Sequence, residues 1–266
     1  MNNQINSLAI LTVATNKYIY YWEQMIRSAD TKLLNTDRKI VSHVLTENVK
    51  KAEEIKSQLM NIVVIIHPIQ NYSWPEATLF RYRLYQEIKS AVTENLVMHL
   101  DADMIIMEDF LAKLPNEFMD GVALVRHPGF YRPLGLRKIG FYAKNRNYIR
   151  QDLERYLSMG ALGDWEVTKK STSYVTKQAR DFYFCGGTWF GYRTAFFNLI
   201  NELAEIEKAD TVTGFVPKWH DESILNHWAS KNSFTILTPS YCFDPKYPQL
   251  AKLPEYIRAV TKNEIN

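Results

Sequence analysis

Short apolar runs alternate with amphipathic segments along the first 110 residues. Four apolar runs have the length and β-branched content of strands, at residues 8–14, 39–46, 61–66 and 96–100. Segments with apolar positions at helical spacing lie between them, at residues 18–26, 49–60 and 76–90. Strands that alternate with helices predict a doubly wound α/β fold with a mostly parallel sheet and flanking helices.

The pattern of apolar residues predicts fewer helices and strands in the second half of the chain. Strands are expected at residues 122–125 and 238–244, and helices at about 193–208 and from 219 onwards. Residues 132–170 are the least regular part. They are interpreted as a helical insertion around 147–158, a mobile lid, or a surface for an anionic partner, and the pattern leaves these three open. At 266 residues, the chain is expected to form one domain over 1–266.

Two carboxylates directly follow the strand predicted at residues 96–100. In an open α/β sheet, ligands bind outside the carboxyl ends of the strands, which would place Asp101 and Asp103 where a substrate can reach them. Hard oxygen donors suit Mn²⁺ or Mg²⁺. On spacing alone, however, an Asp-x-Asp pair is more often a solvated turn.

Three further features allow both a structural and a functional interpretation. Arg81 and Arg83 either form a solvated helix face, or one of them reaches the site to hold a phosphate or an aspartate. The glycines after Cys185 fit either a bulge or the close approach of a ligand. Acids in a first helical turn are favoured by the helix dipole, but Trp, His, Asp and Glu in four consecutive positions, 219–222, are unusual for a simple cap.

Composition and charge narrow the class of protein. The net charge is +3 and the basic residues are scattered, which disfavours a nucleic-acid partner. Two cysteines exclude a disulfide framework and fit a reducing compartment. The amino terminus has no basic region, and its apolar stretch is too short for a signal peptide or a membrane span, so we expect a cytoplasmic protein.

Seven segments, in order along the chain, resemble glycosyltransferase family six, the family of the histo-blood group A and B transferases and α-1,3-galactosyltransferase. They are residues 14–18, 78–81, 101–104, 127–131, 181–187, 219–223 and 239–244. His-Pro-Gly-Phe-Tyr at 127–131 and Trp-His-Asp-Glu-Ser at 219–223 are the specific signals. The resemblance covers the chain from about residue 8 to its end.

The resemblance implies a GT-A type fold and a defined reaction. A nucleotide-binding half would span about residues 8–110, and an acceptor-binding and catalytic half about 120–266, with the insertion at about 132–170. The reaction would be a retaining α-1,3 transfer of N-acetylgalactosamine or galactose from a UDP-sugar donor to a galactoside-type oligosaccharide or glycolipid acceptor. Double displacement and same-face attack both fit retention.

The resemblance also implies a donor site. The residues matched to the uracil cradle are Val13, Ala14, Thr15 and Tyr18. Asp101 and Asp103 would hold Mn²⁺, or Mg²⁺, on the diphosphate, and Ala102 between them also belongs to the donor site. Arg81 would contact the donor near these aspartates, and Lys262 would close over the diphosphate. Metal and cations would neutralise the UDP leaving group as the glycosidic bond breaks.

Catalytic and substrate-binding roles follow in the same way. Glu222 matches the candidate nucleophile beneath the anomeric carbon, and Asp221 its partner on the sugar hydroxyls. Further substrate contacts are implied for His127, Trp219, His220, Cys185, Gly186 and Gly187. The motif 185–187 would set donor choice, and the missing methyl at Gly187 leaves room for an acetamido group. This favours UDP-N-acetylgalactosamine over UDP-galactose.

Departures from the family's animal members leave alternatives open. The chain has no membrane anchor or stem and so looks like a bacterial or viral member, and both aspartates are present, which favours metal dependence. Residues 132–170 exceed the corresponding loop of the animal members, which leaves the identity of the acceptor open. One alternative is a retaining hexosyltransferase that uses UDP-glucose on a lipopolysaccharide or lipid-linked acceptor, with this basic insertion touching a membrane surface. The other is a carbohydrate-binding protein without catalysis. The oligomeric state stays unknown.

Overall fold

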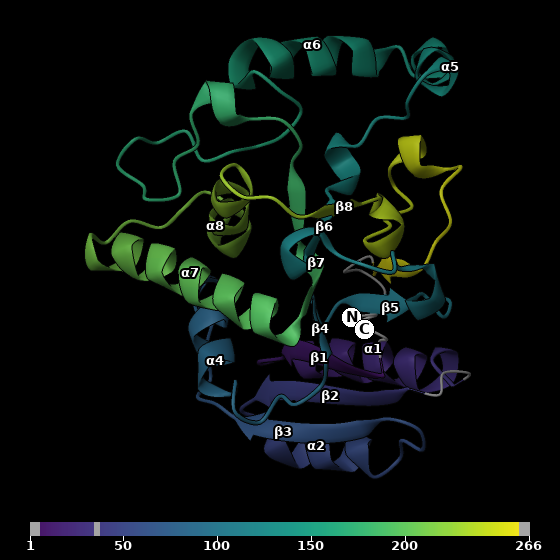
Figure 1. Ribbon diagram of the computed structural model, residues 1–266, viewed down its shortest axis with the longest axis vertical. Helices are drawn as coiled ribbons and strands as arrows, with labels where there is room; N and C mark the ends of the chain where they lie inside the picture. Colours follow the sequence, from purple (N-terminus) through teal and green to yellow (C-terminus); the bar gives the residue numbers. More distant parts are fainter. Residues whose placement is uncertain (1–5, 35–37, 261–266) are drawn as a thin grey trace.

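A seven-stranded sheet forms the centre of the molecule in the computed structural model, which describes residues 6–34 and 38–260 (Figure 1). Its order is β3-β2-β1-β4-β7-β6-β8. The strands are β1 (Ser7–Val13), β2 (Lys39–Thr46), β3 (Val63–Pro68), β4 (Leu96–Leu100), β6 (Val122–Arg126), β7 (Phe184–Tyr192) and β8 (Thr235–Leu237). Strand β7 is antiparallel to both of its neighbours, and the other pairs are parallel. The predicted mostly parallel, GT-A type sheet in a single domain is confirmed.

Helices cover both faces of this sheet (Figure 1). One core packs α1 (Tyr18–Lys32), α2 (Val49–Lys56) and a small antiparallel sheet of β5 (Met104–Ile106) and β9 (Ile257–Ala259). The other core packs α4 (Arg81–Glu87), α7 (Arg193–Val212) and α8 (His220–Ala229). Successive strand residues point to opposite faces. In β1, Leu8 and Ile10 therefore enter the first core, whereas Ala9 and Leu11 enter the second.

The helix predicted at residues 76–90 is two helices. Helix α3 (Glu76–Leu79) ends at Phe80, whose φ of −89° and ψ of 2° leave the helical range, and α4 begins at Arg81. Because of this break, the Arg81 side chain points toward the sheet. Its buried ionic contacts, described below, outweigh the weak preference of the sequence for a continuous helix.

The prediction of a strand at residues 238–244 is wrong. Pro239–Tyr241 is a 3₁₀ turn closed by a bond from the Cys242 N–H to the Pro239 carbonyl, 3.0 Å long. Proline has a fixed φ and no N–H to donate to a neighbouring strand, so β8 ends at Leu237 and does not continue through Pro239. The third strand extends through His67 and Pro68, two residues beyond its predicted end, because both pair with β2.

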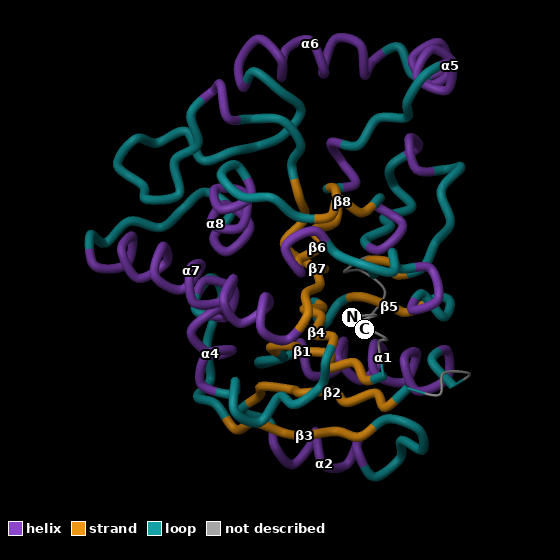
Figure 2. Tube along the Cα trace, viewed as in Figure 1, coloured by secondary structure: helices purple, strands orange, loops and turns teal. Residues whose placement is uncertain are grey.

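The irregular segment 132–170 contains two helices, α5 (Leu136–Lys144) and α6 (Asn147–Met159). They lie along one end of the molecule, away from the sheet (Figure 2). The helical interpretation of this insertion is thus confirmed, and a long loop then returns the chain to β7. Within residues 6–34 and 38–260, helices of sufficient length and apolarity to span a bilayer are absent.

Candidate active site

The site forms where β4 ends beside β1 and β7. The Asp101 N–H donates to the Gly187 carbonyl over 2.9 Å, and the Thr12 hydroxyl donates to the Leu100 carbonyl over 2.9 Å. These bonds fix the carboxyl edge of β4 between its two neighbours. The expectation that Asp101 stands at this edge agrees with the structure.

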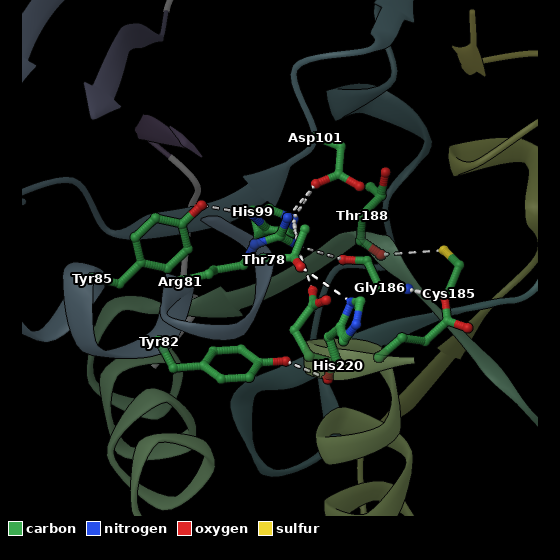
Figure 3. A network of polar contacts seen from close by, with 12 residues as sticks. Thr78, Arg81, Tyr82, Tyr85, His99, Asp101, Cys185, Gly186, Thr188 and His220 are labelled. Carbon is green, nitrogen blue, oxygen red and sulfur yellow. Dashed lines mark hydrogen bonds and ion pairs between the residues drawn. The ribbon is translucent and has the colours of Figure 1, made fainter. Parts of the chain in front are cut away.

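Arg81 connects three residues of the site from its position at the start of α4. Its Nη2 donates to Asp101 Oδ1 over 2.7 Å, and its Nη1 donates to Asp221 Oδ2 over 2.7 Å and to His99 Nε2 over 2.8 Å (Figure 3). Although burial alone would lower it, the charges of the two aspartates hold the pKa of Arg81 above its ordinary value. Of the two arginines considered, Arg81 reaches the site, whereas Arg83 pairs with Glu207.

His99 is a neutral histidine that contacts the Arg81 guanidinium. Its ring is fully buried, and this burial, with the Arg81 charge, lowers its pKa to about 4. The Tyr85 hydroxyl donates to the Leu11 carbonyl and lies 2.7 Å from His99 Nδ1. We therefore assign the proton to Nδ1, which donates to Tyr85, and leave Nε2 to accept from Arg81.

The two aspartates offer a small set of hard oxygen donors. Burial would raise the pKa of Asp101, but the Arg81 charge holds it well below its usual range, so this carboxylate is ionised at neutral pH. Asp103 lies two residues further on, partly exposed, and its carbonyl accepts from the Val260 N–H over 2.9 Å. In the described part of the chain, groups of three or more His, Cys, Asp or Glu that could hold a metal do not occur. The pair fits Mn²⁺ or Mg²⁺ if diphosphate oxygens and water complete the shell.

Asp221 and Glu222 face β7 from the first turn of α8. Glu222 Oε2 accepts from the Gly186 N–H over 2.8 Å. Burial raises the pKa of Glu222 to about 7 and that of Asp221 to about 6. A Cβ on Gly186 would lie 3.1 Å from the Glu222 Cβ and 3.4 Å from Asp221 Oδ2, so an added methyl would push against the first turn of α8.

Gly187 has a different neighbour. A Cβ at this position would lie 2.9 Å from Asp101 Oδ2, closer than real Cβ contacts allow. The missing methyl therefore gives room first to the Asp101 carboxylate, which sequence reasoning did not foresee. Cys185, before the two glycines, is buried and its thiol contacts the Thr188 carbonyl.

The N-terminus of α8 lies against the segment before α4. His220 adopts a positive φ of 46°, a strained conformation that residues other than glycine adopt mainly where the surrounding structure enforces it. Its ring packs edge-on against Trp74, with centroids 5.0 Å apart, and its Nδ1 lies 3.4 Å from the Thr78 hydroxyl. The neighbouring Trp219 ring is 47% exposed and so can contact a ligand.

His127 directly follows β6, and one of its ring nitrogens already takes part in a hydrogen bond. Its Nδ1 accepts from the Gly129 N–H over 3.0 Å, and its ring packs against Phe130 and Tyr183. Burial and the nearby Lys246 lower its pKa to about 4, so the ring is neutral at pH 7. Because Nδ1 accepts, Nε2 carries the proton and is available to donate to a hydroxyl.

The residues matched to the uracil cradle lie at the end of β1 and between it and the start of α1, at the same edge of the sheet. Ala14 and Thr15 are buried, and Val13 and Tyr18 are partly buried. The Ala14 N–H donates to the Leu45 carbonyl, and the Tyr18 N–H donates to the Thr15 carbonyl. Ala102 is buried between the two aspartates, whereas Lys262 lies outside the described residues.

Two residues that sequence reasoning missed hold the site together. Asp164 accepts from Trp219 Nε1 over 2.7 Å, from Lys218 Nζ over 2.8 Å and from Arg155 Nη1 over 2.8 Å. Asn226 donates to the Phe184 carbonyl and accepts from the Phe184 N–H, which clamps α8 to β7. The position of Asn226, four residues after Glu222 on one helix face, was a usable signal, whereas Asp164 gave none in its loop.

Comparisons with known proteins point to a glycosyltransferase family. A model of glycosyltransferase family 6 matches residues 156–266. The chain is 23% identical over 269 residues to histo-blood group ABO system transferase 1 of Rattus norvegicus, an alignment that covers 98% of this chain and 68% of that protein. It is 25% identical over 194 residues to O-antigen biosynthesis glycosyltransferase WbnI of Escherichia coli, covering 72% of this chain and 70% of that protein. Together these matches show that the chain is similar to members of glycosyltransferase family six, and they support a glycosyltransferase as its enzyme class.

Proposed function

We propose that this enzyme is a retaining α-1,3-glycosyltransferase that moves N-acetylgalactosamine or galactose from UDP to a galactoside-type acceptor, with the help of a divalent metal. The observation that carries the proposal is the Arg81 bridge, which links Asp101 on the donor side to Asp221 beside Glu222 with two contacts of 2.7 Å. This bridge joins a diphosphate-binding edge and a carboxylate pair in one buried network. A binding protein without catalysis has no use for that combination.

Arg81 and the two aspartates would handle the leaving group. Asp101 and Asp103 would hold the metal, which would supply positive charge to the diphosphate leaving group. Arg81 keeps the Asp101 carboxylate ionised and fixes its direction through the 2.7 Å contact with Oδ1. The other oxygen, Oδ2, remains on the Gly187 side.

Glu222 would act at the anomeric carbon, either as the nucleophile of a double displacement or as the anion that stabilises an oxocarbenium-like centre. The Gly186 N–H holds one carboxylate oxygen. With a pKa of about 7, the group is partly ionised at neutral pH and needs modest help to become an anion. Asp221, fixed by Arg81, would orient the hydroxyls of the donor sugar.

The acceptor would lie between His127 and Trp219. The free Nε2 of His127 donates to a hydroxyl, and the exposed Trp219 ring offers an apolar face to a sugar. For the donor we propose UDP-N-acetylgalactosamine over UDP-galactose. A tenfold preference for UDP-galactose in initial rates would reverse that choice. The cytoplasmic location expected from the sequence stays a prediction.

Calorimetric titration with UDP, with and without Mn²⁺, tests the metal-assisted donor site. We expect tight binding only with Mn²⁺, and we expect Asp101→Asn to weaken the Mn²⁺-dependent part by about tenfold or more. As a matched control, Asp109→Asn lies outside the site and should bind as the wild type does. Equal binding without metal would mean that the two aspartates have a structural role, and no UDP binding at all would remove the basis of the proposal.

A further inference from the structure

Helices α5 and α6 present their leucine and isoleucine side chains to solvent, although Phe141 of α5 is buried, whereas an ordinary surface helix turns such residues toward the core. In α6, Ile149, Leu153 and Leu157 recur every four residues, and Leu157 is 70% exposed. The face turned toward the protein instead buries Asp152, which is 5% exposed. In α5, Leu136 and Ile139 are 85% and 67% exposed. We call residues 134–159 the α5–α6 hairpin.

The α5–α6 hairpin also concentrates positive charge. It contains six basic residues, Arg137, Lys138, Lys144, Arg146, Arg150 and Arg155, and two acidic ones, Asp152 and Glu154. Its net charge is therefore +4, whereas the whole chain carries +3, so the rest of the chain is slightly acidic. All of these basic residues except Arg155 are classed as exposed.

The hairpin is firmly attached to the acceptor side. Arg132 forms a two-bond pair with Asp152, at 2.6 Å and 2.5 Å, and donates to the carbonyls of Gly129 and Tyr131. The Tyr142 hydroxyl donates to Asp152 over 2.6 Å. A cavity of about 460 Å³ lies between α6 and the segment around Gly129. The apolar outer face is thus held rigidly, beside the segment that presents His127.

We propose that the α5–α6 hairpin docks on the surface of an anionic lipid bilayer. Exposed apolar stripes flanked by lysine and arginine are the features by which a helix lies in a membrane interface. A second copy of this chain fits less well, because a two-fold contact through the hairpin would bring two surfaces of +4 together. The hairpin lies along one end of the molecule (Figure 1). Docking there would hold the acceptor side next to lipid-linked glycans.

Vesicle co-sedimentation of the full chain, without substrate, tests the docking independently of the proposed reaction. The probes are vesicles of phosphatidylcholine alone and of phosphatidylcholine with phosphatidylglycerol. We expect binding to the anionic vesicles only, and loss of binding as the ionic strength is raised from about 0.05 M to about 0.5 M. Because each basic residue near such a surface is worth about fivefold in affinity, replacing four should lower the affinity by about 10² to 10³-fold.

Two sets of variants separate the apolar and the basic contributions. The apolar set is Leu136→Ser, Leu153→Ser and Leu157→Ser, and its control replaces three exposed apolar residues elsewhere, Met60→Ser, Met119→Ser and Val212→Ser. The basic set replaces Arg137, Lys138, Lys144 and Arg146 with Gln, and its control replaces Lys50, Lys89, Lys208 and Lys252 with Gln. Thermal melting followed by circular dichroism verifies that each variant is folded.

The proposal requires that both hairpin sets lose vesicle binding while both control sets keep it. Absence of binding to anionic vesicles would overturn it. Equal binding by hairpin and control variants would overturn it as well. The protein could instead form a dimer that the apolar substitutions dissociate, and show no binding to vesicles. That result would assign the face to contact with a second copy of the chain and would reject the lipid surface.

Discussion

Asp101 Oδ2 lies 2.9 Å from the place that a Cβ on Gly187 would occupy. The other oxygen of the same carboxylate is held by Arg81 at 2.7 Å, so the group cannot turn away without losing its buried ionic partner. Gly187 is thus coupled to the edge that would bind the diphosphate, in addition to any role in the choice of donor sugar.

Gly187→Ala separates these two roles. If the added methyl displaces Asp101, the rates with UDP-N-acetylgalactosamine and with UDP-galactose should both fall by about tenfold or more, with a higher Mn²⁺ requirement. Initial rates with the two donors over a range of Mn²⁺ concentration measure this. Retention of the UDP-galactose rate, with loss only of UDP-N-acetylgalactosamine transfer, would show that the methyl acts on the acetamido group alone.

Arg81→Lys should lower kcat/KM by about 10²-fold to 10³-fold. A lysine has a single charged nitrogen and cannot contact Asp101, Asp221 and His99 in the fixed geometry of the guanidinium. Arg83→Lys, two residues along the same helix and paired with Glu207, is the matched control and should stay within about threefold. Similar losses in both variants would point to a general effect on α4.

The pH profile of kcat/KM should rise toward alkaline pH with an apparent pKa near 7. The pKa of Glu222 is raised to about 7 by burial, and the proposed chemistry needs its anionic form. Measuring initial rates between about pH 5.5 and 8.5 provides the profile. A flat profile in this range would mean that Glu222 is already ionised at about pH 5.5, which contradicts a raised pKa for this carboxyl group.

Glu222→Gln should abolish most turnover, leave UDP affinity unchanged, and stabilise the fold at alkaline pH. A carboxyl group with a raised native pKa favours the fold while protonated, and this stability is lost as the pH rises from about 4.5 toward about 7. Glutamine does not ionise. The Tm of Glu222→Gln should therefore increase relative to the Tm of the wild type between about pH 5 and about pH 8. Glu205→Gln, on the exposed side of α7, should show a constant difference.

Asp164 is expected to position Trp219 for the acceptor. Asp164→Ala removes the oxygen that accepts from Trp219 Nε1 and the partner of Lys218 and Arg155, so the acceptor KM should rise about tenfold. Asp164→Asn keeps an accepting oxygen and should recover part of the loss. The donor KM is the internal control, and an equal change in donor and acceptor KM would contradict the assignment.

Sequence reasoning was most successful where a short pattern directly reports local structure. The strands 39–46 and 96–100 were predicted with their observed bounds, because runs of β-branched and apolar residues between polar turns identify buried strands. It failed for the three-residue strands β5, β8 and β9, which contain too few residues for a period to appear. It also failed for the break at Phe80, where helix propensity argues for continuity.

The sequence by itself determined the class of fold, the carboxylates at the end of β4 and the acidic start of α8, since each depends on residues close together in the chain. Tertiary structure alone decided that Arg81 joins Asp101 to Asp221, that Gly187 makes room for Asp101, and that Asp164 supports Trp219. These relationships connect residues that are 20 to 140 positions apart. No local pattern encodes them, because they arise only when packing of the two cores brings separate elements to one edge of the sheet.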